Sequence, residues 1–291
     1  MTYSTLDVPV RGGTLRVGRW DAATDAPTVF LAHGITANHV AFRPLAEALG
    51  AEGVNVIAPD LRGRGRSNAL PAPYSSRSHA EDAVAVLDAL GVTEPIVFGG
   101  HSGGGFAGLL FATVAPERVR HLLLLDGGPR LAVPEDLDID VVLQAVIGPA
   151  MARLEMTFPS LEAYLDYWRP HPAVSEAWGP TVEEYLRYDL VGEPPEMRSS
   201  VSIESVRGDA MSNLTGEPPR LDTGVPTTML RAERGLMNEP GGLYPLEAVQ
   251  PLVDEAGIPL ETIHDVNHYS MIWLPAGIRA IVDAAMKALT G

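Results

Sequence analysis

Short apolar runs alternate with longer amphipathic segments along most of this chain. The apolar runs are rich in valine, isoleucine and leucine, as is typical of strands buried on both faces, and they cover residues 28–32, 54–58, 95–98, 122–125, 227–230 and 260–263. Between these runs, apolar residues recur at helical spacing in residues 42–49, 79–90, 106–114, 246–256 and 276–289. This order predicts an α/β fold with a mostly parallel central β-sheet flanked by helices. The residues up to Trp20 instead predict a hairpin pair of strands.

The alternation of strands and helices stops after Asp126. From about residue 130 to residue 214 the pattern shows no buried strand, and apolar residues recur at helical spacing in residues 141–154, 161–168 and 182–190. We therefore expect a helical cap formed by residues 130–214, inserted into a core formed by residues 1–129 and 215–291. Aromatic residues in such a cap either pack its own core or line a ligand cavity. The candidates for a substrate-binding role there are Tyr164, Trp168, Trp178 and Tyr185.

Composition restricts the classes of function. The chain has 291 residues, 46% of them hydrophobic, so it can bury a substantial core, but residues 122–125 are too short an aliphatic run to cross a bilayer. A net charge of −16 argues against a nucleic-acid or membrane-surface partner. Because there is no cysteine, disulfides, thiolate metal sites and a cysteine nucleophile are excluded. We expect a soluble, cytoplasmic protein that acts on a small molecule; the sequence does not indicate an oligomeric state.

Five glycines surround one serine in the stretch FGGHSGGGF, residues 98–106, directly after a predicted strand. In one interpretation, residues 100–104 form a G-x-S-x-G turn that lifts the Ser102 hydroxyl above the sheet. In the other, residues 103–108 form a G-x-G-x-x-G dinucleotide fingerprint, with Asp126 at the distance expected for a ribose ligand. The first glycine of a dinucleotide turn belongs at the end of the strand, whereas Gly103 lies several residues beyond Phe98. The spacing therefore favours the serine interpretation.

A second glycine turn, His33-Gly34-Ile35, follows the predicted strand at residues 28–32. A serine hydrolase needs backbone N–H groups directed at the oxygen on which negative charge develops, and a turn in this place can supply one beside the residue that follows the nucleophile. The candidate donors are Ile35 and Gly103. His33 and His101, which adjoin the two glycine turns, are candidates for contact with the substrate.

The segment DLRGRGRS, residues 60–67, follows the next predicted strand. We expect its glycines to turn the chain while Asp60 and Arg62 brace neighbouring loops, and we assign it no chemistry.

His268 follows the last predicted strand, where a loop can deliver a base to a serine nucleophile. His264 and His268 also have the i and i+4 spacing of a metal-binding pair. The segment follows a strand and lacks the glutamate of an H-E-x-x-H helix, so we predict no metal site.

Together, HG at 33–34, DxRGxGxS at 60–67, GHSGG at 100–104 and the late histidine resemble the α/β-hydrolase superfamily along the whole chain. The predicted insertion lies where that family carries its helical cap. The resemblance implies Ser102 as nucleophile, His268 as base and acid, and Ile35 and Gly103 as oxyanion donors, with no cofactor.

The acid of the triad departs from the common pattern of the family. Many members have an Asp after the strand that follows the cap, in a G-x-x-D pattern, but residues 232–235 here read AERG. Haloalkane dehalogenases and zearalenone-type lactonases take the acid from the end of the preceding strand, a position that corresponds to Asp126. By this resemblance we predict Asp126 as the acid, with Glu233 as the reserve and Glu239 behind it.

These residues predict a serine hydrolase that cleaves an ester or lactone of a hydrophobic small molecule through an acyl-enzyme. Hydrolysis of a carbon–carbon bond and cofactor-free perhydrolysis use similar frameworks, and a non-catalytic ligand receptor on the same fold is a further alternative.

Overall fold

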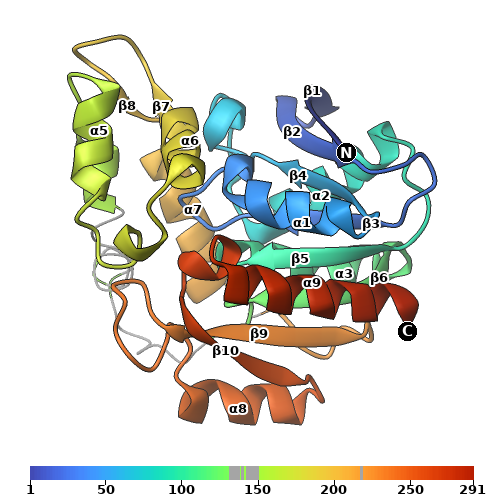
Figure 1. Cartoon of the computed structure of the whole chain (residues 1–291). Helices are drawn as coiled ribbons and strands as arrows, with labels where there is room; N and C mark the ends of the chain where they lie inside the picture. Colours follow the sequence, from blue (N-terminus) through green and yellow to red (C-terminus); the bar gives the residue numbers. More distant parts are fainter. Residues whose placement is uncertain (131–137, 139–140, 142–150, 217–218) are drawn as a thin grey trace.

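A computed structural model of the chain describes residues 1–130, 138, 141, 151–216 and 219–291 (Figure 1). Its centre is an eight-stranded sheet with the strand order β1-β2-β4-β3-β5-β6-β9-β10. β1 pairs antiparallel with β2, and β2 with β4, while the other neighbours are parallel. The strands are β1 (Thr2–Val10), β2 (Gly13–Asp21), β3 (Thr28–Ala32), β4 (Asn55–Pro59), β5 (Ile96–His101), β6 (Val119–Leu125), β9 (Thr227–Arg234) and β10 (Leu260–Asn267).

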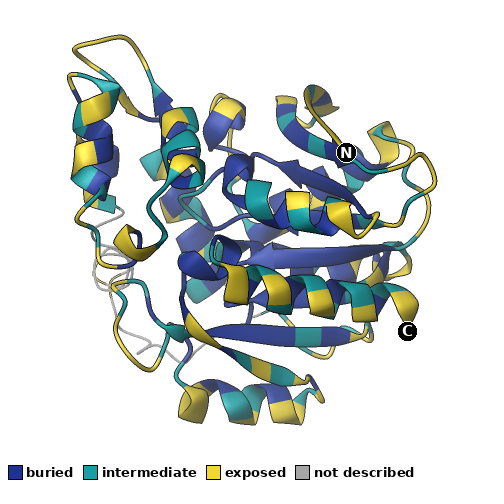
Figure 2. Cartoon of the chain, in the orientation of Figure 1, coloured by how far each residue is buried: buried dark blue, intermediate teal, exposed yellow. Residues whose placement is uncertain are grey.

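Helices cover both faces of this sheet. One face packs against α1 (Arg43–Ala51) and α9 (Pro275–Thr290), and the other packs against α2 (Ser76–Ala89), α3 (Gly103–Val114) and α8 (Leu246–Glu255). Figure 2 shows that the central strands are buried while the outer sides of α1 and α9 are exposed. The predicted parallel sheet and its five flanking helices are confirmed.

Successive side chains of a strand point to opposite faces of the sheet, so one strand contributes to the apolar clusters on both faces. In β3, Val29 and Leu31 belong to the apolar cluster on the side of α1 and α9. Phe30 and Ala32 belong to the cluster on the side of α2 and α3. Because both sets of side chains are apolar and buried, the strand reads as a continuous hydrophobic run in the sequence.

Between β6 and β9 the chain forms α5 (Leu161–Trp168), α6 (Pro180–Asp189) and α7 (Ile203–Leu214), with β7 (Leu190–Val191) paired to β8 (Arg198–Ser199). These elements lie beyond one end of the sheet, on the left in Figure 1. α5 and α6 match the expected helices, whereas α7 was not predicted. Most of the expected helix at residues 141–154 lies outside the described residues.

In the part of the chain that the structure describes, no helix is both long enough and apolar enough to cross a membrane.

Candidate active site

Ser102 lies at the turn between β5 and α3, with φ 54° and ψ −121°. Few non-glycine residues adopt this backbone conformation, which raises the free energy of the folded state locally, so surrounding contacts must hold it. The Ser102 N–H donates to the carbonyl oxygen of Leu125 at 2.9 Å, and the Gly105 N–H donates to the carbonyl oxygen of Ser102 at 2.9 Å. The turn therefore has the strand–serine–helix geometry that the G-x-S-x-G interpretation predicts.

The glycines around Ser102 allow close contact between backbones. A Cβ at Gly100 would collide with the Gly104 carbonyl, and one at Gly104 would collide with the Ala32 carbonyl. A Cβ at Gly105 would lie 2.6 Å from the carbonyl carbon of Gly127. The packing of this turn against β3 and the loop after β6 thus accounts for the glycines without a bound nucleotide.

His268, which follows β10, is buried and contacts Asp126 at the end of β6. The distance from His268 Nδ1 to Asp126 Oδ2 is 2.7 Å, and Asp126 is fully buried. Asp126 Oδ1 accepts from the Ala232 N–H at 3.1 Å, so both carboxylate oxygens are bonded. A carboxylate oxygen can only accept, so Nδ1 donates and Nε2 of the neutral ring is left free to take a proton. Both oxygens of the Asp126 carboxylate are therefore bonded within the protein. The dinucleotide interpretation needs this carboxylate to bind a ribose, so it loses its support.

Glu233, the reserve candidate for the acid of the triad, bonds residues other than His268. Its side chain is 42% exposed and accepts from His264 Nδ1 and from the Asp265 N–H, both at 3.0 Å. Glu239 accepts from the Met237 N–H at 2.7 Å. His264 and His268 thus bond to different carboxylates, one exposed and one buried.

The loop after β3 lies against the serine turn. A Cβ at Gly34 would be 3.5 Å from Ser102 Oγ, and one at Gly103 would be 3.2 Å from the Ile35 nitrogen. The two backbone N–H groups predicted as oxyanion donors therefore lie beside the serine.

His33 holds this loop as a neutral ring. Its Nε2 accepts from the Leu61 N–H at 2.9 Å, so its Nδ1 carries the proton and donates to the Gly34 carbonyl at 2.8 Å. Burial lowers the pKa of His33 to about 3.

His101 joins the nucleophile turn to the base. Its Nε2 donates to the His268 carbonyl at 2.9 Å, and the two ring centroids are 4.7 Å apart. Burial, and then the charge on His268, lower the pKa of His101 to about 3. The His101 ring is therefore neutral near pH 7.

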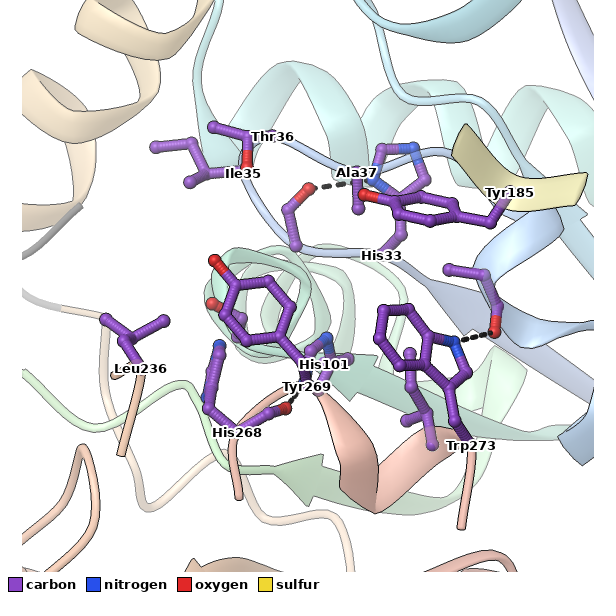
Figure 3. A pocket seen from close by; sticks show the side chains of 14 residues that line it. His33, Ile35, Thr36, Ala37, His101, Tyr185, Leu236, His268, Tyr269 and Trp273 are labelled. Atoms are coloured by element: carbon purple, nitrogen blue, oxygen red, sulfur yellow. Dashed lines mark hydrogen bonds between the residues drawn. The ribbon is translucent and has the colours of Figure 1, made fainter. Parts of the chain in front are cut away.

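Ser102 and His268 line one pocket of about 40 Å³ (Figure 3). The described residues that line it are His33, Gly34, Ile35, Thr36, Ala37, Ala41, His101, Ser102, Tyr185, Leu236, His268, Tyr269, Ile272 and Trp273. Figure 3 shows the loop residues Ile35 and Thr36 on one side and His268 with His101 on the other.

Three of the predicted aromatic contacts lie outside this pocket. Tyr164 is fully buried and donates its hydroxyl hydrogen bond to Asp189, and Trp168 is buried beneath Arg153. The Trp178 indole N–H donates to Glu183 at 3.1 Å. These side chains pack the inserted helices, as aromatic residues in an amphipathic helix commonly do, and they are not among the described residues that line this pocket. Tyr185 does line it.

Sequence reasoning missed Tyr269 and Trp273, which contribute most of the aromatic wall. Their ring centroids are 6.3 Å apart. The available signal was adjacency, because Tyr269 directly follows the predicted base and the short 3₁₀ helix Ser270–Ile272 then presents Trp273.

Asp60 and Arg62 of the DLRGRGRS segment brace neighbouring segments, as expected. Asp60 is buried and accepts from His39 Nδ1 and the Tyr188 hydroxyl, both at 2.7 Å. Arg62 forms a two-pronged pair with Asp82 at 2.7 and 3.0 Å.

The mostly parallel sheet with helices on both faces and a strand–serine–helix turn at β5 is the α/β-hydrolase fold. A family model described as the alpha/beta hydrolase fold matches residues 27–152. The "Putative carbamate hydrolase RutD" of Caulobacter segnis is 39% identical over 132 residues, which are 45% of this chain and 47% of that relative. A "Putative non-heme haloperoxidase" of Mycobacterium phage D29 is 36% identical over 111 residues, 38% of this chain and 39% of that relative. The matches therefore span less than half the length of these curated relatives.

Solved structures match over nearly the whole chain. E-2-(acetamidomethylene)succinate hydrolase has a TM-score of 0.79 at 20% identity, covering 100% of both chains. The enol-lactonase of Burkholderia xenovorans has a TM-score of 0.67 at 19% identity, covering 98% of this chain and 100% of that one. The chain therefore has the α/β-hydrolase fold, and residues 27–152 match the model of that family.

Proposed function

We propose that this protein is a serine hydrolase that cleaves a carboxylic ester or lactone of a small apolar molecule. The observation that carries the proposal is one arrangement: Ser102 on its turn shares a pocket with His268, whose Nδ1 is bonded to the buried Asp126. The relatives' names include a carbamate hydrolase and an enol-lactonase, both of which describe cleavage at a carbonyl group.

In the proposed cycle, Ser102 Oγ attacks the substrate carbonyl carbon while His268 Nε2 takes the hydroxyl proton. The carbonyl oxygen becomes negative and accepts hydrogen bonds from the Ile35 and Gly103 N–H groups. His268 then gives the proton to the leaving alcohol, and the acyl group remains on Ser102. Water attacks this acyl-enzyme with the same histidine as base, which releases the acid and restores the serine.

The pocket favours an uncharged, short acyl group. Among the described residues that line it, the side chains carry aliphatic, aromatic, imidazole or hydroxyl groups and no carboxylate, ammonium or guanidinium. In the same proposal, residues 130–214 form a cap over a core of residues 1–129 and 215–291.

The test is hydrolysis of p-nitrophenyl butyrate by the wild type and by Ser102→Ala, together with mass-detected labelling by a fluorophosphonate. We expect both turnover and label to disappear in the variant, with the label on Ser102 in the wild type. A wild type that binds ligands but neither turns over nor takes the label would indicate a receptor on this fold and overturn the proposal.

A further inference from the structure

Two buried arginines hold successive carbonyl groups of the loop at residues 33–37. Arg64 Nε donates to the Ile35 carbonyl at 2.9 Å, and Arg153 Nη2 donates to the Thr36 carbonyl at 2.8 Å. Neither side chain is more than 1% exposed. All five residues of this loop line the pocket that contains Ser102. The loop that carries one proposed oxyanion donor is therefore bonded to two guanidinium groups away from the pocket.

Each arginine is paired with a carboxylate from the inserted segment. Arg64 Nη2 lies 2.6 Å from Asp209 Oδ2 on α7. Arg153 Nη2 lies 3.7 Å from Asp189 Oδ2 at the end of α6, and its Nε donates to the Tyr164 hydroxyl at 3.2 Å. The Tyr164 hydroxyl in turn donates to Asp189. Both links run from the inserted helices, through a guanidinium, to the loop.

Hydrogen bonds to the carbonyl groups of this loop restrict the direction in which the Ile35 N–H points. In a trans peptide unit the N–H and C=O point in opposite directions, so the Gly34 carbonyl sets where the Ile35 N–H points. That carbonyl accepts from His33 Nδ1 at 2.8 Å and from the Ala37 N–H at 3.1 Å. The next two peptide units along the loop are held by Arg64 and Arg153. Three consecutive peptide planes are thus fixed, and two of them depend on the arginines.

We propose, on the basis of the serine hydrolase function above, that Arg64 and Arg153 are positioning residues through which the inserted helices set the orientation of the Ile35 N–H for the transition state. Their role is geometric rather than electrostatic, because each guanidinium is paired with a carboxylate that offsets its field. A guanidinium presents several N–H donors in one plane and can bond a carboxylate and a carbonyl together. A lysine keeps the charge but not this geometry.

The experiment compares Arg64→Lys and Arg153→Lys with Arg62→Lys. Arg62 is a matched control because it is as buried as Arg64 and Arg153 and lies two residues before Arg64. Its guanidinium bonds Asp82 and the Pro71 carbonyl instead of the loop at residues 33–37. We expect kcat for p-nitrophenyl butyrate to fall about 10- to 100-fold in the first two variants, with KM changed less than about twofold. In Arg62→Lys, kcat should change less than about threefold.

Two ketones provide a readout that a general structural defect would not reproduce. Phenyl trifluoromethyl ketone forms a negatively charged adduct with a serine, so its Ki should rise in Arg64→Lys and Arg153→Lys by the same factor as kcat/KM falls. Acetophenone, which has a similar shape but forms no stable adduct, should keep its Ki. If the lysine variants do not fold, Asp189→Asn and Asp209→Asn keep the side-chain shape and should lower kcat several-fold in the same pattern.

The outcomes separate the two proposals. A wild type that neither turns over nor takes a fluorophosphonate label overturns the hydrolase function itself, and with it the catalytic role of the arginines. A wild type that is active, with Arg64→Lys and Arg153→Lys indistinguishable from Arg62→Lys in kcat and in trifluoromethyl ketone Ki, overturns the positioning role alone.

Discussion

At the scale of single residues, two backbone positions with positive φ define the site. Ser102 has φ 54° and Asp126 has φ 48°. Aspartate tolerates left-handed backbone better than most residues, whereas serine with ψ −121° is strained. Both residues are held by hydrogen bonds between neighbouring strand ends, from the Ser102 N–H to the Leu125 carbonyl and from the Asp126 N–H to the Leu230 carbonyl.

Substitution of the buried carboxylate should separate the two candidate acids. Asp126→Asn should lower kcat by about 10³- to 10⁴-fold, because an amide no longer stabilises the protonated His268 or holds its tautomer. Glu233→Gln should change kcat little, since Glu233 bonds the exposed His264. Steady-state kinetics on p-nitrophenyl butyrate measure both variants, and the reverse ranking would move the acid to Glu233.

Stability should depend on pH through the two neutral histidines. His33 and His101 have a folded pKa of about 3, below the ordinary value of 6.5, so below pH 6.5 the unfolded chain binds protons that the folded chain does not. The free energy of unfolding should therefore fall as pH drops from 6.5 to 4, by about 1.4 kcal/mol per pH unit for each histidine. Urea unfolding at several pH values measures this slope. His101→Gln keeps a donor for the His268 carbonyl and should reduce the slope by about one proton; equal slopes would refute the assignment.

At the scale of elements, α7 shows why one helix escaped prediction. Its buried face includes Ser205, Asp209 and Asn213, which are spaced four residues apart and bond Gly63, His79 and Ser76 respectively. A helix with a polar buried face gives a weak hydrophobic period, so the sequence pattern does not reveal it. The contacts that stabilise α7 are to distant segments, such as the DLRGRGRS segment and α2.

The junction of β5 and α3 should tolerate no side chain at Gly104. An alanine Cβ there would collide with the Ala32 carbonyl of β3, so Gly104→Ala should reduce the free energy of unfolding by about 3 kcal/mol or more. Gly179→Ala is the matched control because no atom lies within 4 Å of its Cβ position and its φ is 172°. Thermal and urea unfolding measure both, and similar stabilities would show that the helix and strand can separate without cost.

At the scale of the whole molecule, the inserted helices and the sheet share one apolar cluster. Phe158, Leu165 and Leu186 of the insertion belong to the same cluster as Leu45 of α1 and Ile281 of α9. The inserted helices are thereby packed on the core, and Arg64 and Arg153 also link them to the loop at residues 33–37.

The acyl chain length of the preferred esters should depend on the volume of the pocket that Ser102 and His268 line. Because the pocket volume of about 40 Å³ is small, kcat/KM should be highest for p-nitrophenyl acetate to butyrate and fall at least tenfold for the octanoate. Steady-state kinetics with the acetate, butyrate, hexanoate and octanoate esters measure this dependence on chain length. A rate that rises steadily to the octanoate would mean that the acyl group binds elsewhere.

Much of this architecture followed from local patterns. Buried strands were recognisable because both faces of β3 and its neighbours are apolar, and Ser102 stood out because its glycines are required by close backbone contacts. His268 could be placed by its position after the last strand. These features depend on residues close together in the chain, which is the information that periodicity and turn composition carry.

The sequence by itself therefore determined which segments form strands and helices, their alternation along the chain, and the turn that carries Ser102. The pairing of His268 depends on the tertiary structure: the resemblance predicted Asp126 with Glu233 as the reserve, but only the fold brings Asp126, 142 positions away, to His268. The tertiary structure also decided which aromatic residues face the pocket, because Tyr164 and Tyr185 lie on helices with similar patterns but only Tyr185 lines it. Contacts between distant segments depend on how helices and loops pack in three dimensions, which no local period encodes.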